Sequence, residues 1–375
     1  MNRKRIVFLG FDHGKDDRRI AKDINLLKAR FHITYFYRAD EFETSTSKDG
    51  VNYVGLKVDN NYPRLVRRFK YENEMTKRAV DIGAHFFYLH GMFITFPGFF
   101  LRKLKRFGDI IYDAHEYDLE PVYIKSPIFR QTLSYFLLFR QKRISGLIKS
   151  SFSVSPSILR FMQKCHFNNV HLKMNVSDTK VLKPLALQKR EPVLVIAGNI
   201  SRERGVNQFL EIFKQMKDKG ASLSLHIHSR IDDPELEVHL KKWVDKNLPN
   251  GSVIFGGFLP YTRLKEKLSQ SIAGVMAFPS DGSITNRIAL PNRFFDSLAS
   301  GTPILASRDS VDVAEYVESQ NIGWLFDPDD PSQDISFFLH EITSHSKYSD
   351  KLKNVYRFAE ENDVKSVKRA LKLAF

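Results

Sequence analysis

Short apolar runs alternate with amphipathic stretches along the chain, which is the pattern of parallel β-strands joined by α-helices. In the first half of the chain, the apolar runs predict strands at residues 5–9, 32–37, 51–58, 86–90, 110–113 and 152–155, the last being the final strand of that half. In the second half, they predict strands at residues 192–198, 222–228, 253–258, 272–278, 303–306 and 322–326. Apolar residues at helical spacing predict helices at residues 18–29, 62–81, 99–107, 156–165, 206–217, 261–269, 291–299, 311–318, 334–341 and 350–373.

The order of these elements indicates two α/β domains. A chain of 375 residues is long enough for two domains of ordinary size, and apolar residues make up 42% of it, which is enough for two hydrophobic cores. Residues 177–191 are polar and lack apolar periodicity. We therefore expect the linker between the two domains there.

Cysteine usage and the lengths of the apolar runs narrow the class of protein. Cys165 is the single cysteine, which excludes an internal disulfide framework and fits a reducing cytoplasm; we expect it to be a packed thiol rather than a nucleophile. The apolar run at residues 6–9 is too short for a signal peptide, and no run approaches the ~18 residues of a membrane span. We therefore expect a cytoplasmic protein.

Positive charge is concentrated in the first half of the chain. Residues 1–175 hold 31 Lys and Arg against 17 Asp and Glu, whereas residues 176–375 hold 27 against 26. A basic field attracts anionic lipid, nucleic acid or anionic substrates. No nucleic-acid-binding motif accompanies this charge, so we expect no nucleic-acid partner.

Residues 122–150 mix Tyr, Phe and Leu with Lys and Arg, and two interpretations fit this composition. The stretch is an interfacial helix, whose aromatic rings enter lipid headgroups while its cations meet anionic lipid, or it is a core helix with a solvated basic face. The basic helices predicted at residues 62–81 and 99–107 favour the first interpretation. Peripheral contact with an anionic membrane surface is therefore an expectation for the first domain.

The stretch at residues 277–307 says most about function. A buried strand, a polar loop, a helix start and a second buried strand follow one another there. Pro291 suits the first turn of the helix because its missing N–H would be unpaired there, and Gly301 ends the helix. A loop that leads from a parallel strand into a helix N-terminus is suited to bind an anion such as a nucleotide diphosphate.

The sequence of this helix also resembles a known family. Residues 291–296, Pro-Asn-Arg-Phe-Phe-Asp, and residues 299–304, Ala-Ser-Gly-Thr-Pro-Ile, resemble the nucleotide-sugar site of retaining GT-B glycosyltransferases of family 4. The resemblance implies that the segment binds the donor through Ser283, Pro291, Asn292, Arg293 and Asp296.

The match departs from the family at three positions. Asp296 stands where the family has Glu, and the resemblance implies that it holds the ribose hydroxyls. Arg293 stands where the family has Lys. Many members also carry a first Glu, which falls at Ile288 here, so that carboxylate is absent.

A second match follows the first strand of the second domain. Residues 199–205, Asn-Ile-Ser-Arg-Glu-Arg-Gly, resemble the family element whose cation binds the donor diphosphate, which implies that Arg204 is the phosphate ligand. The alternative is an exposed cation at the helix start. Asn199 stands where many members have a second Arg, so that contact is missing or is supplied by Arg202.

Two further loops resemble donor-binding loops of the family. In relatives, the backbone after the third strand of the second domain meets the nucleobase, which makes Phe258 and Leu259 base neighbours; core packing is the alternative. The loop after the first strand holds Gly10 and Gly14, near donor phosphates and acceptor by the resemblance, with His13 on the acceptor side. A tight turn alone also explains these glycines, and the loop lacks the Gly-x-Gly-x-x-Gly pattern of dinucleotide sites.

Residues 112–116, Tyr-Asp-Ala-His-Glu, form a third match at the end of a predicted central strand. Such strand ends face the ligand crevice of a parallel sheet. The resemblance implies that His115 approaches the donor sugar, the alternative being a buried histidine bonded to a neighbour. Glu116 either faces the acceptor or caps the next helix.

The resemblance implies a GT-B fold, in which two Rossmann-like, doubly wound parallel-sheet domains flank a cleft. We assign the acceptor domain to residues 1–176 and the donor domain to residues 190–345. In the family, the terminal helix crosses back onto the first domain. Residues 346–375 hold 8 Lys and Arg against 4 Asp and Glu, which continues the charge of that domain.

The predicted activity is transfer of a sugar from UDP or GDP to a lipid-linked or glycan acceptor at the membrane surface, as in polysaccharide biosynthesis, with retention at the anomeric carbon. We expect no cofactor or metal, since no ligand spacing occurs and the pairs Asp232-Asp233 and Asp327-Pro328-Asp329 fit turns. The residues expected to carry catalysis are His115, Arg204 and Asp296. The alternative is a catalytically inactive GT-B scaffold that acts as a nucleotide-binding partner or regulator.

Overall fold

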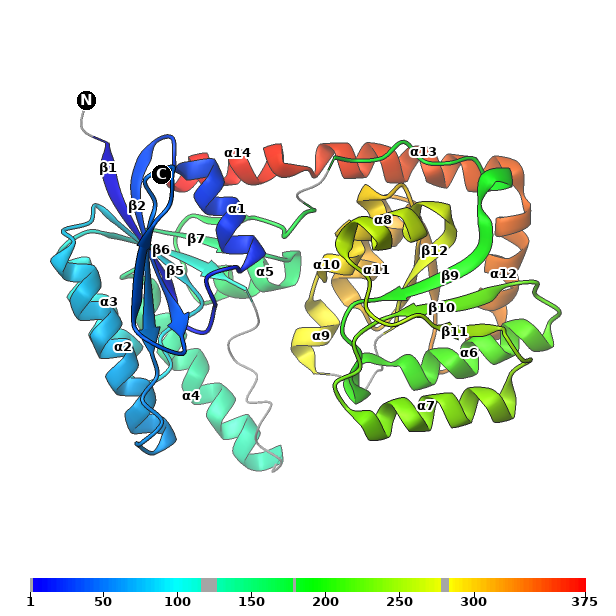
Figure 1. Ribbon diagram of the computed structural model, residues 1–375, viewed down its shortest axis with the longest axis horizontal. Helices are drawn as coiled ribbons and strands as arrows, with labels where there is room; N and C mark the ends of the chain where they lie inside the picture. Colours follow the sequence, from blue (N-terminus) through cyan, green and yellow to red (C-terminus); the bar gives the residue numbers. More distant parts are fainter. Residues whose placement is uncertain (1–2, 116–126, 178–179, 278–282) are drawn as a thin grey trace. The chain divides into compact units, whose positions relative to one another are not determined.

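The apolar runs of the sequence become strands that are covered on both faces, as parallel sheets require. The computed structural model describes residues 3–115, 127–177, 180–277 and 283–375. By internal contacts, the chain divides into a first unit, Met1–Met174 with Val367–Phe375, and a second unit, Asn175–Ser366 (Figure 1). The expected crossover segment at residues 346–375 is thus divided between the two units.

The first unit is built on a sheet of eight strands in the order β3-β4-β2-β1-β5-β6-β7-β8. The strands are β1 (Lys4–Gly10), β2 (Phe31–Ala39), β3 (Glu43–Thr46), β4 (Asn52–Lys57), β5 (Phe86–His90), β6 (Asp109–Ala114), β7 (Ser150–Ser153) and β8 (Val170–Leu172). All neighbours are parallel except β3, which pairs with β4 in the antiparallel sense at the sheet edge.

Helices lie on both sides of this sheet, with α2 and α3 on one side and α1, α5 and α14 on the other (Figure 1). The helices are α1 (Arg18–Leu27), α2 (Arg64–Asp81), α3 (Pro97–Lys105), α4 (Pro127–Ser145), α5 (Pro156–Lys164) and α14 (Val364–Ala374). The Phe375 ring packs edge-on against Phe31, Phe86 and Tyr88, with ring centroids 5.4–5.7 Å apart. The end of the chain therefore completes the hydrophobic core of the first unit.

The second unit is built on six parallel strands in the order β11-β10-β9-β12-β13-β14. The strands are β9 (Glu191–Ala197), β10 (Ser224–His228), β11 (Val253–Phe255), β12 (Ser271–Met276), β13 (Ile304–Ser307) and β14 (Gly323–Phe326). The helices are α6 (Val206–Asp218), α7 (Pro234–Asn247), α8 (Tyr261–Gln270), α9 (Ile284–Ile288), α10 (Asn292–Ala299), α11 (Val311–Ser319), α12 (Ser332–Thr343) and α13 (His345–Glu361), with short 3₁₀ turns η1 (Leu187–Lys189) and η2 (Arg202–Arg204).

Both sheets reverse their strand order beside their first strand. In the first unit the reversal falls between β1 and β5, where Gly10 pairs with His90 at the carboxyl ends. In the second unit it falls between β9 and β12. Ligands of doubly wound sheets bind outside the carboxyl ends of the strands at such a reversal. Each unit therefore has one position where the connecting helices leave the strand ends accessible.

The predicted α/β fold is confirmed, with specific differences. The strand at residues 152–155 is not the last of the first unit, because β8 follows it. The sequence prediction also lacked the edge strand β3 and the helices α7 and α9. The single helix predicted at residues 350–373 is two helices, which break after α13, where the Asp363 carboxylate accepts a hydrogen bond from the Lys365 backbone N–H at 2.7 Å.

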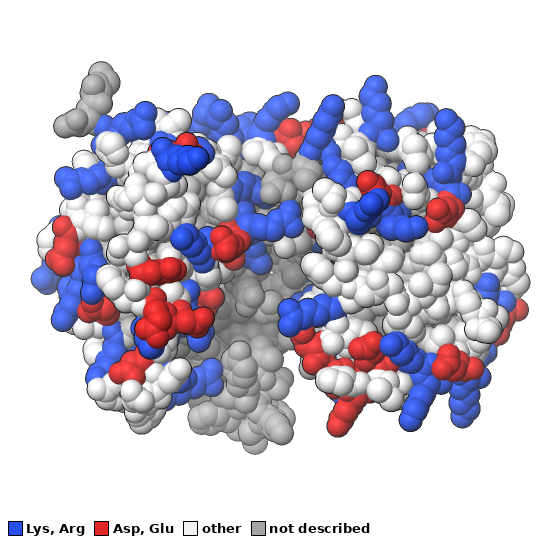
Figure 2. Space-filling model, viewed as in Figure 1, with Lys and Arg blue, Asp and Glu red and all other residues white. Residues whose placement is uncertain are grey.

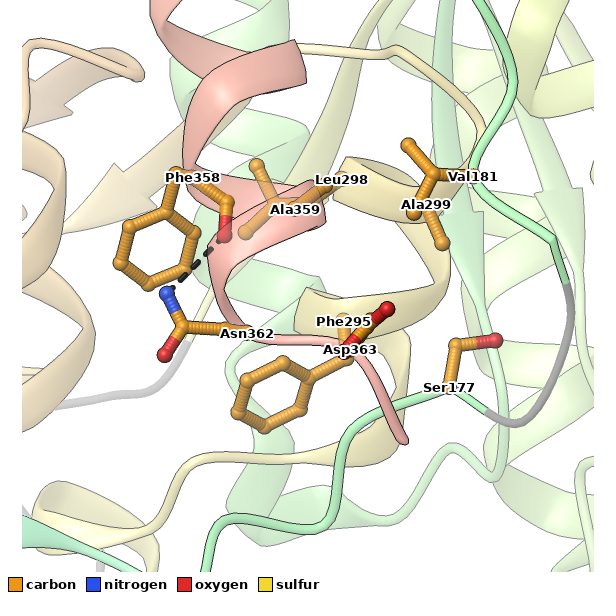
Figure 3. Close-up of a pocket in the computed structure, with 9 residues that line it drawn as sticks. All are labelled: Ser177, Val181, Phe295, Leu298, Ala299, Phe358, Ala359, Asn362 and Asp363. Atoms are coloured by element: carbon orange, nitrogen blue, oxygen red, sulfur yellow. Dashed lines mark hydrogen bonds between the residues drawn. The ribbon is translucent and has the colours of Figure 1, made fainter. Parts of the chain in front are cut away.

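Helix α10 is held from behind by α13. Phe294 of α10 packs against Phe358 of α13 with ring centroids 6.3 Å apart. On this side of α10, the two helices and the chain segments beside them line a hollow of about 10 Å³, the size of one water molecule (Figure 3). Its lining residues are Ser177, Val181, Phe295, Leu298, Ala299, Phe358, Ala359, Asn362 and Asp363. The packing fixes the position of α10, whose polar side chains matter below.

Arg190, just before β9, ties several segments of the second unit together. Its guanidinium donates to the carbonyls of Ser271 and Gly301, each at 2.6 Å, and to that of Leu185 at 2.9 Å. It also lies over the Tyr348 ring of α13, 5.7 Å from the centroid. One buried cation thus donates to three backbone carbonyls from separate segments of the unit.

Replacing Arg190 with methionine should destabilise the second unit by about 3 kcal/mol or more, because the carbonyls lose their donors and each buried unpaired group costs about 1–3 kcal/mol. Both tryptophans, Trp243 and Trp324, lie in this unit, so urea unfolding followed by tryptophan fluorescence isolates its transition.

The matched control is Arg263→Met, which removes an arginine that is 73% exposed and paired with Glu266 on α8. Its free energy of unfolding should change by less than about 0.5 kcal/mol, as for other exposed ion pairs. Equal effects of the two substitutions would contradict the role given to Arg190.

Candidate active site

Two arginines of the second unit lie at the carboxyl end of β9. Arg293, on α10, is only 7% exposed, and its Nη1 makes a long hydrogen bond of 3.5 Å to the carbonyl of Ala197, the last residue of β9. Arg204 ends η2 in the loop that follows β9. Burial, with the positive charge of Arg204, lowers the pKa of Arg293 to about 9. At neutral pH these two guanidinium groups, the cation pair, are charged and repel each other.

Local backbone geometry places the cation pair. Gly205 ends η2 and precedes α6 with φ = 67°, a left-handed conformation that suits glycine. On α10, Arg293 and Asp296 are three residues apart and therefore lie on neighbouring positions of one helix face. Asp296 is 9% exposed. A guanidinium and a carboxylate are thus presented side by side by one buried helix.

The other side chains of the loop after β9 are engaged elsewhere. Asn199 is exposed and donates to the carboxylate of Asp232 at 3.2 Å. The Arg202 guanidinium binds Asp233 at 2.8–2.9 Å, and Asp233 also caps α7 by accepting from the Glu235 and Leu236 N–H groups. Arg202 therefore stabilises the start of α7, which does not support its prediction as a second phosphate ligand.

The start of α10 follows the predicted segment closely. Pro291 is the N-cap rather than a first-turn residue, and its carbonyl accepts from Phe294 N–H at 2.9 Å. Asn292 is exposed in the first turn. Ser283 caps α9 by accepting from the Asn286 N–H at 3.1 Å, and Ile288 ends that helix. The predicted donor segment thus contains two helix starts in succession.

The predicted base neighbours differ in exposure. Phe258, after β11, is 72% exposed, whereas Leu259 is half-buried. The alternative of core packing therefore does not hold for the Phe258 ring.

In the first unit, two histidines and a carboxylate meet at the strand reversal. His90 ends β5, Asp113 lies in β6 and His115 follows β6. His115 Nε2 lies 3.2 Å from His90 Nδ1 and 3.3 Å from Asp113 Oδ2, and the third side of this triangle, from His90 Nδ1 to Asp113 Oδ2, is 3.5 Å. The alternative of a buried histidine bonded to its neighbours therefore describes His115, whose side chain is 7% exposed.

A lysine from β8 joins this group. Lys173 Nζ lies 2.6 Å from Asp113 Oδ2 and 2.6 Å from Asp23 Oδ2 of α1. The Tyr88 hydroxyl donates to the same two oxygens, at 2.8 Å to Asp23 and 3.1 Å to Asp113. We call the six side chains the first-unit cluster, which consists of Asp23, Tyr88, His90, Asp113, His115 and Lys173.

Burial and charge set the protonation of the cluster. Burial favours neutral Asp113, but the charge of Lys173 outweighs it and holds the pKa of Asp113 well below its usual range. Burial raises the pKa of Asp23 above its usual range. Burial lowers the pKa values of His90 and His115, with the Asp113 charge in opposition. The cluster thus combines an ionised Lys173–Asp113 pair with neutral histidines.

The first-strand loop brings His13 to the cluster. The His13 ring stands edge-on to the His115 ring with centroids 4.9 Å apart, and its Nδ1 bonds the Asp17 carboxylate at 2.8 Å. Gly10 is needed for packing, because a Cβ there would lie 2.9 Å from the Tyr35 ring. Gly14 has open space around it, and its carbonyl accepts from the Tyr35 hydroxyl. Glu116 lies outside the described residues.

One group of three described residues has the ligand types of a metal site, namely His90, Asp113 and His115, whose ligand atoms lie within 4.8 Å of one another. However, the carboxylate oxygen that faces the imidazoles, Asp113 Oδ2, already receives the Lys173 ammonium at 2.6 Å. A divalent ion on that oxygen would adjoin another cation. The predicted turn role of Asp327 fits the structure, since its carboxylate accepts from the Asp329 N–H at 2.9 Å.

Comparison with known proteins identifies the family of the second unit. Residues 177–355 match the sequence profile of the family described as glycosyl transferases group 1. The second unit is therefore similar to the group 1 glycosyl transferases. The match spans nearly all of this unit and confirms the sequence prediction of a glycosyltransferase. A search of curated proteins finds no match.

Solved structures show that the chain has the GT-B fold. Sucrose-phosphate synthase from Thermosynechococcus elongatus superposes with a TM-score of 0.74 at 13% identity, covering 99% of this chain and 98% of that one. The UDP-forming α,α-trehalose-phosphate synthase from Burkholderia vietnamiensis gives 0.69 at 11% identity, covering 99% of both chains. HepE from Anabaena, solved with UDP and glucose, gives 0.68 at 12% identity, covering 98% of both. The predicted fold class is confirmed.

Sequence reasoning missed His90, Asp23 and Lys173. A signal was present for His90, because it ends a predicted strand next to the one that leads to His115. No sequence signal connected Asp23 with Lys173, which are 150 residues apart and meet only when β8 joins the sheet edge.

The buried histidines predict how the stability of the first unit depends on pH. His90 and His115 have lower pKa values folded than unfolded, so below about pH 6.5 the unfolded chain binds protons that the folded chain does not. The free energy of unfolding should therefore fall as pH falls from 7 to 5. In His90→Gln the slope should be smaller by up to about 1.4 kcal/mol per pH unit.

Urea unfolding at several pH values measures this slope. The first unit has no tryptophan, so tryptophan fluorescence reports only the second unit. Circular dichroism reports both units, and a transition seen by circular dichroism but not by fluorescence belongs to the first unit. Replacing the exposed His32 with Gln is the control and should keep the wild-type slope. An unchanged slope in His90→Gln would show that this histidine takes up its proton in the folded state.

Proposed function

We propose that this chain transfers a sugar from a nucleotide diphosphate to an acceptor, with retention at the anomeric carbon. The observation that carries the proposal is the buried Arg293, whose Nη1 lies 3.5 Å from the carbonyl of Ala197 at the end of β9, with Arg204 in the loop that follows the same strand. Two adjacent guanidinium groups repel each other, and a bound diphosphate turns that repulsion into attraction. The group 1 family match of the same unit supports this assignment.

Sugar transfer from a nucleotide diphosphate requires the protein to stabilise the diphosphate as it leaves. As the glycosidic bond of the donor breaks, negative charge grows on the phosphate oxygen, and groups already oriented toward it stabilise the transition state most. In this proposal Arg204 and Arg293 supply that stabilisation together with the backbone N–H groups that start α10, and no metal ion takes part. Asp296, next to Arg293 on the helix face, accepts the ribose hydroxyls.

The first unit supplies His115 for the donor sugar. Its neutral imidazole offers a hydrogen bond to a sugar hydroxyl without adding a charge. The donor is a UDP- or GDP-sugar, and the HepE structure with UDP and glucose, at the same fold, supports a uridine nucleotide as the first to test. Phe258, exposed after β11, is the candidate for stacking on the base.

Replacing Arg204 with alanine should lower kcat on a UDP- or GDP-sugar about a hundredfold, because loss of one such group typically costs on the order of 3 kcal/mol of transition-state stabilisation. The rise in melting temperature with UDP or GDP should also shrink. Arg357→Ala, an exposed arginine of α13, is the matched control and should retain wild-type kcat and nucleotide shift. Equal turnover by wild type and Arg204→Ala would remove the proposed site.

A second function is a non-catalytic GT-B scaffold, which is favoured by Ile288 in place of a family carboxylate and by Asn199, engaged with Asp232, in place of an arginine. The same experiment separates the two. Nucleotide-dependent thermal shifts without turnover across a broad donor panel would favour the scaffold.

We propose that the acceptor is lipid-linked or lies at an anionic membrane surface. Helix α3 neighbours both α2 and α4 (Figure 1). Large apolar side chains at the start of α3 and along α4 are exposed, and basic side chains lie on the same two helices. We call this surface the aromatic–basic face, made of Phe96, Phe99, Tyr135, Phe136 and Phe139 with Arg102, Arg140, Lys142 and Arg143. Each of its aromatic side chains is more than half exposed. Aromatic rings near cations suit a headgroup region.

Positive charge alone does not distinguish the aromatic–basic face from the rest of the surface. On the side drawn in Figure 2, Lys and Arg side chains lie over both units and are interspersed with Asp and Glu. The local combination of exposed rings with cations on neighbouring helices is what distinguishes the aromatic–basic face. No helix among the described residues has both the length and the apolar character needed to cross a bilayer.

The double substitution Phe99→Ser, Phe136→Ser should weaken binding to phosphatidylglycerol-containing vesicles about tenfold, because each ring contributes apolar area to the interface. Vesicle co-sedimentation measures the change. Phe337→Ser on α12, which removes a phenylalanine 53% exposed in the second unit, is the control. Equal binding by wild type and the double variant would remove this face as the membrane contact.

A further inference from the structure

The first-unit cluster contains three buried charged side chains. Asp23, Asp113 and Lys173 are all at least nine-tenths buried, and one ammonium bridges the two carboxylates. Buried ion pairs of this kind contribute little net stability, since well-packed apolar residues of the same volume do as well or better. Stability alone therefore does not account for this arrangement of charges.

Asp113 Oδ2 is the centre of that geometry. It receives Lys173 Nζ at 2.6 Å and the Tyr88 hydroxyl at 3.1 Å, and it faces His115 Nε2 at 3.3 Å. An ionised carboxylate only accepts hydrogen bonds, so the proton of His115 belongs on Nε2. The neutral ring carries one proton, which leaves a lone pair on Nδ1. That nitrogen is buried and has no hydrogen-bond partner among the described residues.

We propose that Lys173 is a positioning residue: through Asp113 it fixes His115 as the neutral Nε2–H tautomer, which presents Nδ1 as the acceptor for a sugar hydroxyl. The inference deepens the proposed function and rests on it for the identity of the ligand. The hydroxyl is recognised by a hydrogen-bond acceptor, so a donor with that hydroxyl replaced by hydrogen or fluorine loses this contact.

Lys173 is suited to this task by its place in the chain. It follows β8, and its backbone N–H donates to the Ser153 carbonyl of β7 at 2.8 Å. Its ammonium also lies 5.5 Å from the Phe152 ring centroid and 5.8 Å from that of Tyr88. The aromatic rings and the strand contact confine the side chain to the two carboxylates. Lys173, next to the last residue of the first segment of this unit, is thereby linked to His115 through Asp113.

Other charged or titratable groups face His115 from several elements. His90 of β5 lies at 3.2 Å, and His13 of the first-strand loop stands edge-on with Asp17 behind it. Arg19 of α1 acts on His115 by its positive charge. None of the described groups in contact with His115, other than Asp113, is a permanent acceptor for Nε2–H, so the tautomer depends on the Lys173–Asp113 pair.

The test is Lys173→Met. Without the ammonium, two buried carboxylates must take up a proton, so the acidic limb of the pH–rate profile should move up by about one pH unit. Loss of the fixed tautomer should lower kcat about 10- to 100-fold, the size expected when one hydrogen bond to the ligand is lost and its partner is left unpaired. Lys173→Arg, which keeps the charge, should recover part of kcat and return the limb toward wild type.

The matched control removes another lysine–aspartate pair from the same strand. Lys149 Nζ lies 2.7 Å from Asp109 at the other end of β6, far along the strand from Asp113. Lys149→Met should keep the wild-type kcat and pH profile. An equal loss in both variants would assign Lys173 a purely structural role and overturn the proposal.

A second measurement does not depend on turnover. In protein labelled with ¹⁵N-histidine, the ring nitrogen shifts of His115, assigned with His115→Gln, should show the Nε2–H tautomer in wild type and its loss in Lys173→Met. The Nδ1–H tautomer in wild type would overturn the proposal even if transferase activity is confirmed. If no donor is turned over, the proposed function fails while the tautomer result still decides this inference.

Metal analysis of the purified protein tests the alternative that His90, Asp113 and His115 bind a metal ion. The expected result is no stoichiometric divalent metal, with kcat unchanged by a chelator. A stoichiometric metal that is lost in Asp113→Asn would show that His90, Asp113 and His115 are ligands, and the positioning role of Lys173 would be wrong.

Discussion

In a doubly wound parallel sheet, the connections that follow the strands on either side of the reversal in strand order run to opposite sides. This constraint shapes the site candidates of both units. Where the strand order reverses, two neighbouring connections diverge, and the carboxyl ends of the strands border a crevice. The reversal beside β1 collects His90, Asp113 and His115, and the one beside β9 collects Arg204 and Arg293. Both sets of functional candidates thus follow from the same topological feature, repeated in each unit.

The two units handle charge at this position in opposite ways. The first unit pairs its charges internally, because Lys173 bridges Asp23 and Asp113 and the histidines stay neutral. In the second unit, burial and the positive charge of Arg204 lower the pKa of Arg293. An internally balanced cluster can orient a neutral ligand group, whereas a pair of cations is complementary to an anion. This difference supports the proposed roles of His115 toward the sugar and of Arg204 and Arg293 toward the diphosphate.

Sequence patterns predicted most of the fold because buried parallel strands and amphipathic helices have distinct periodicities. They missed β3, whose four residues are all exposed, and β8, a three-residue edge strand, because neither has a buried apolar run. They predicted His115 and the α10 segment from local motifs. They could not predict Lys173 with Asp23, or the pairing of Arg202 with Asp233, because those contacts arise from tertiary structure between distant segments.

The departures from the family pattern on α10 have a consistent physical meaning. A buried lysine loses its proton readily, whereas a guanidinium with a pKa near 9 stays charged at neutral pH despite burial and a neighbouring cation. Arg293 therefore keeps its charge although its side chain is only 7% exposed. Asp296, one methylene shorter than glutamate, keeps a carboxylate on the buried helix. Together the two substitutions preserve a cation and a carboxylate on one face of α10.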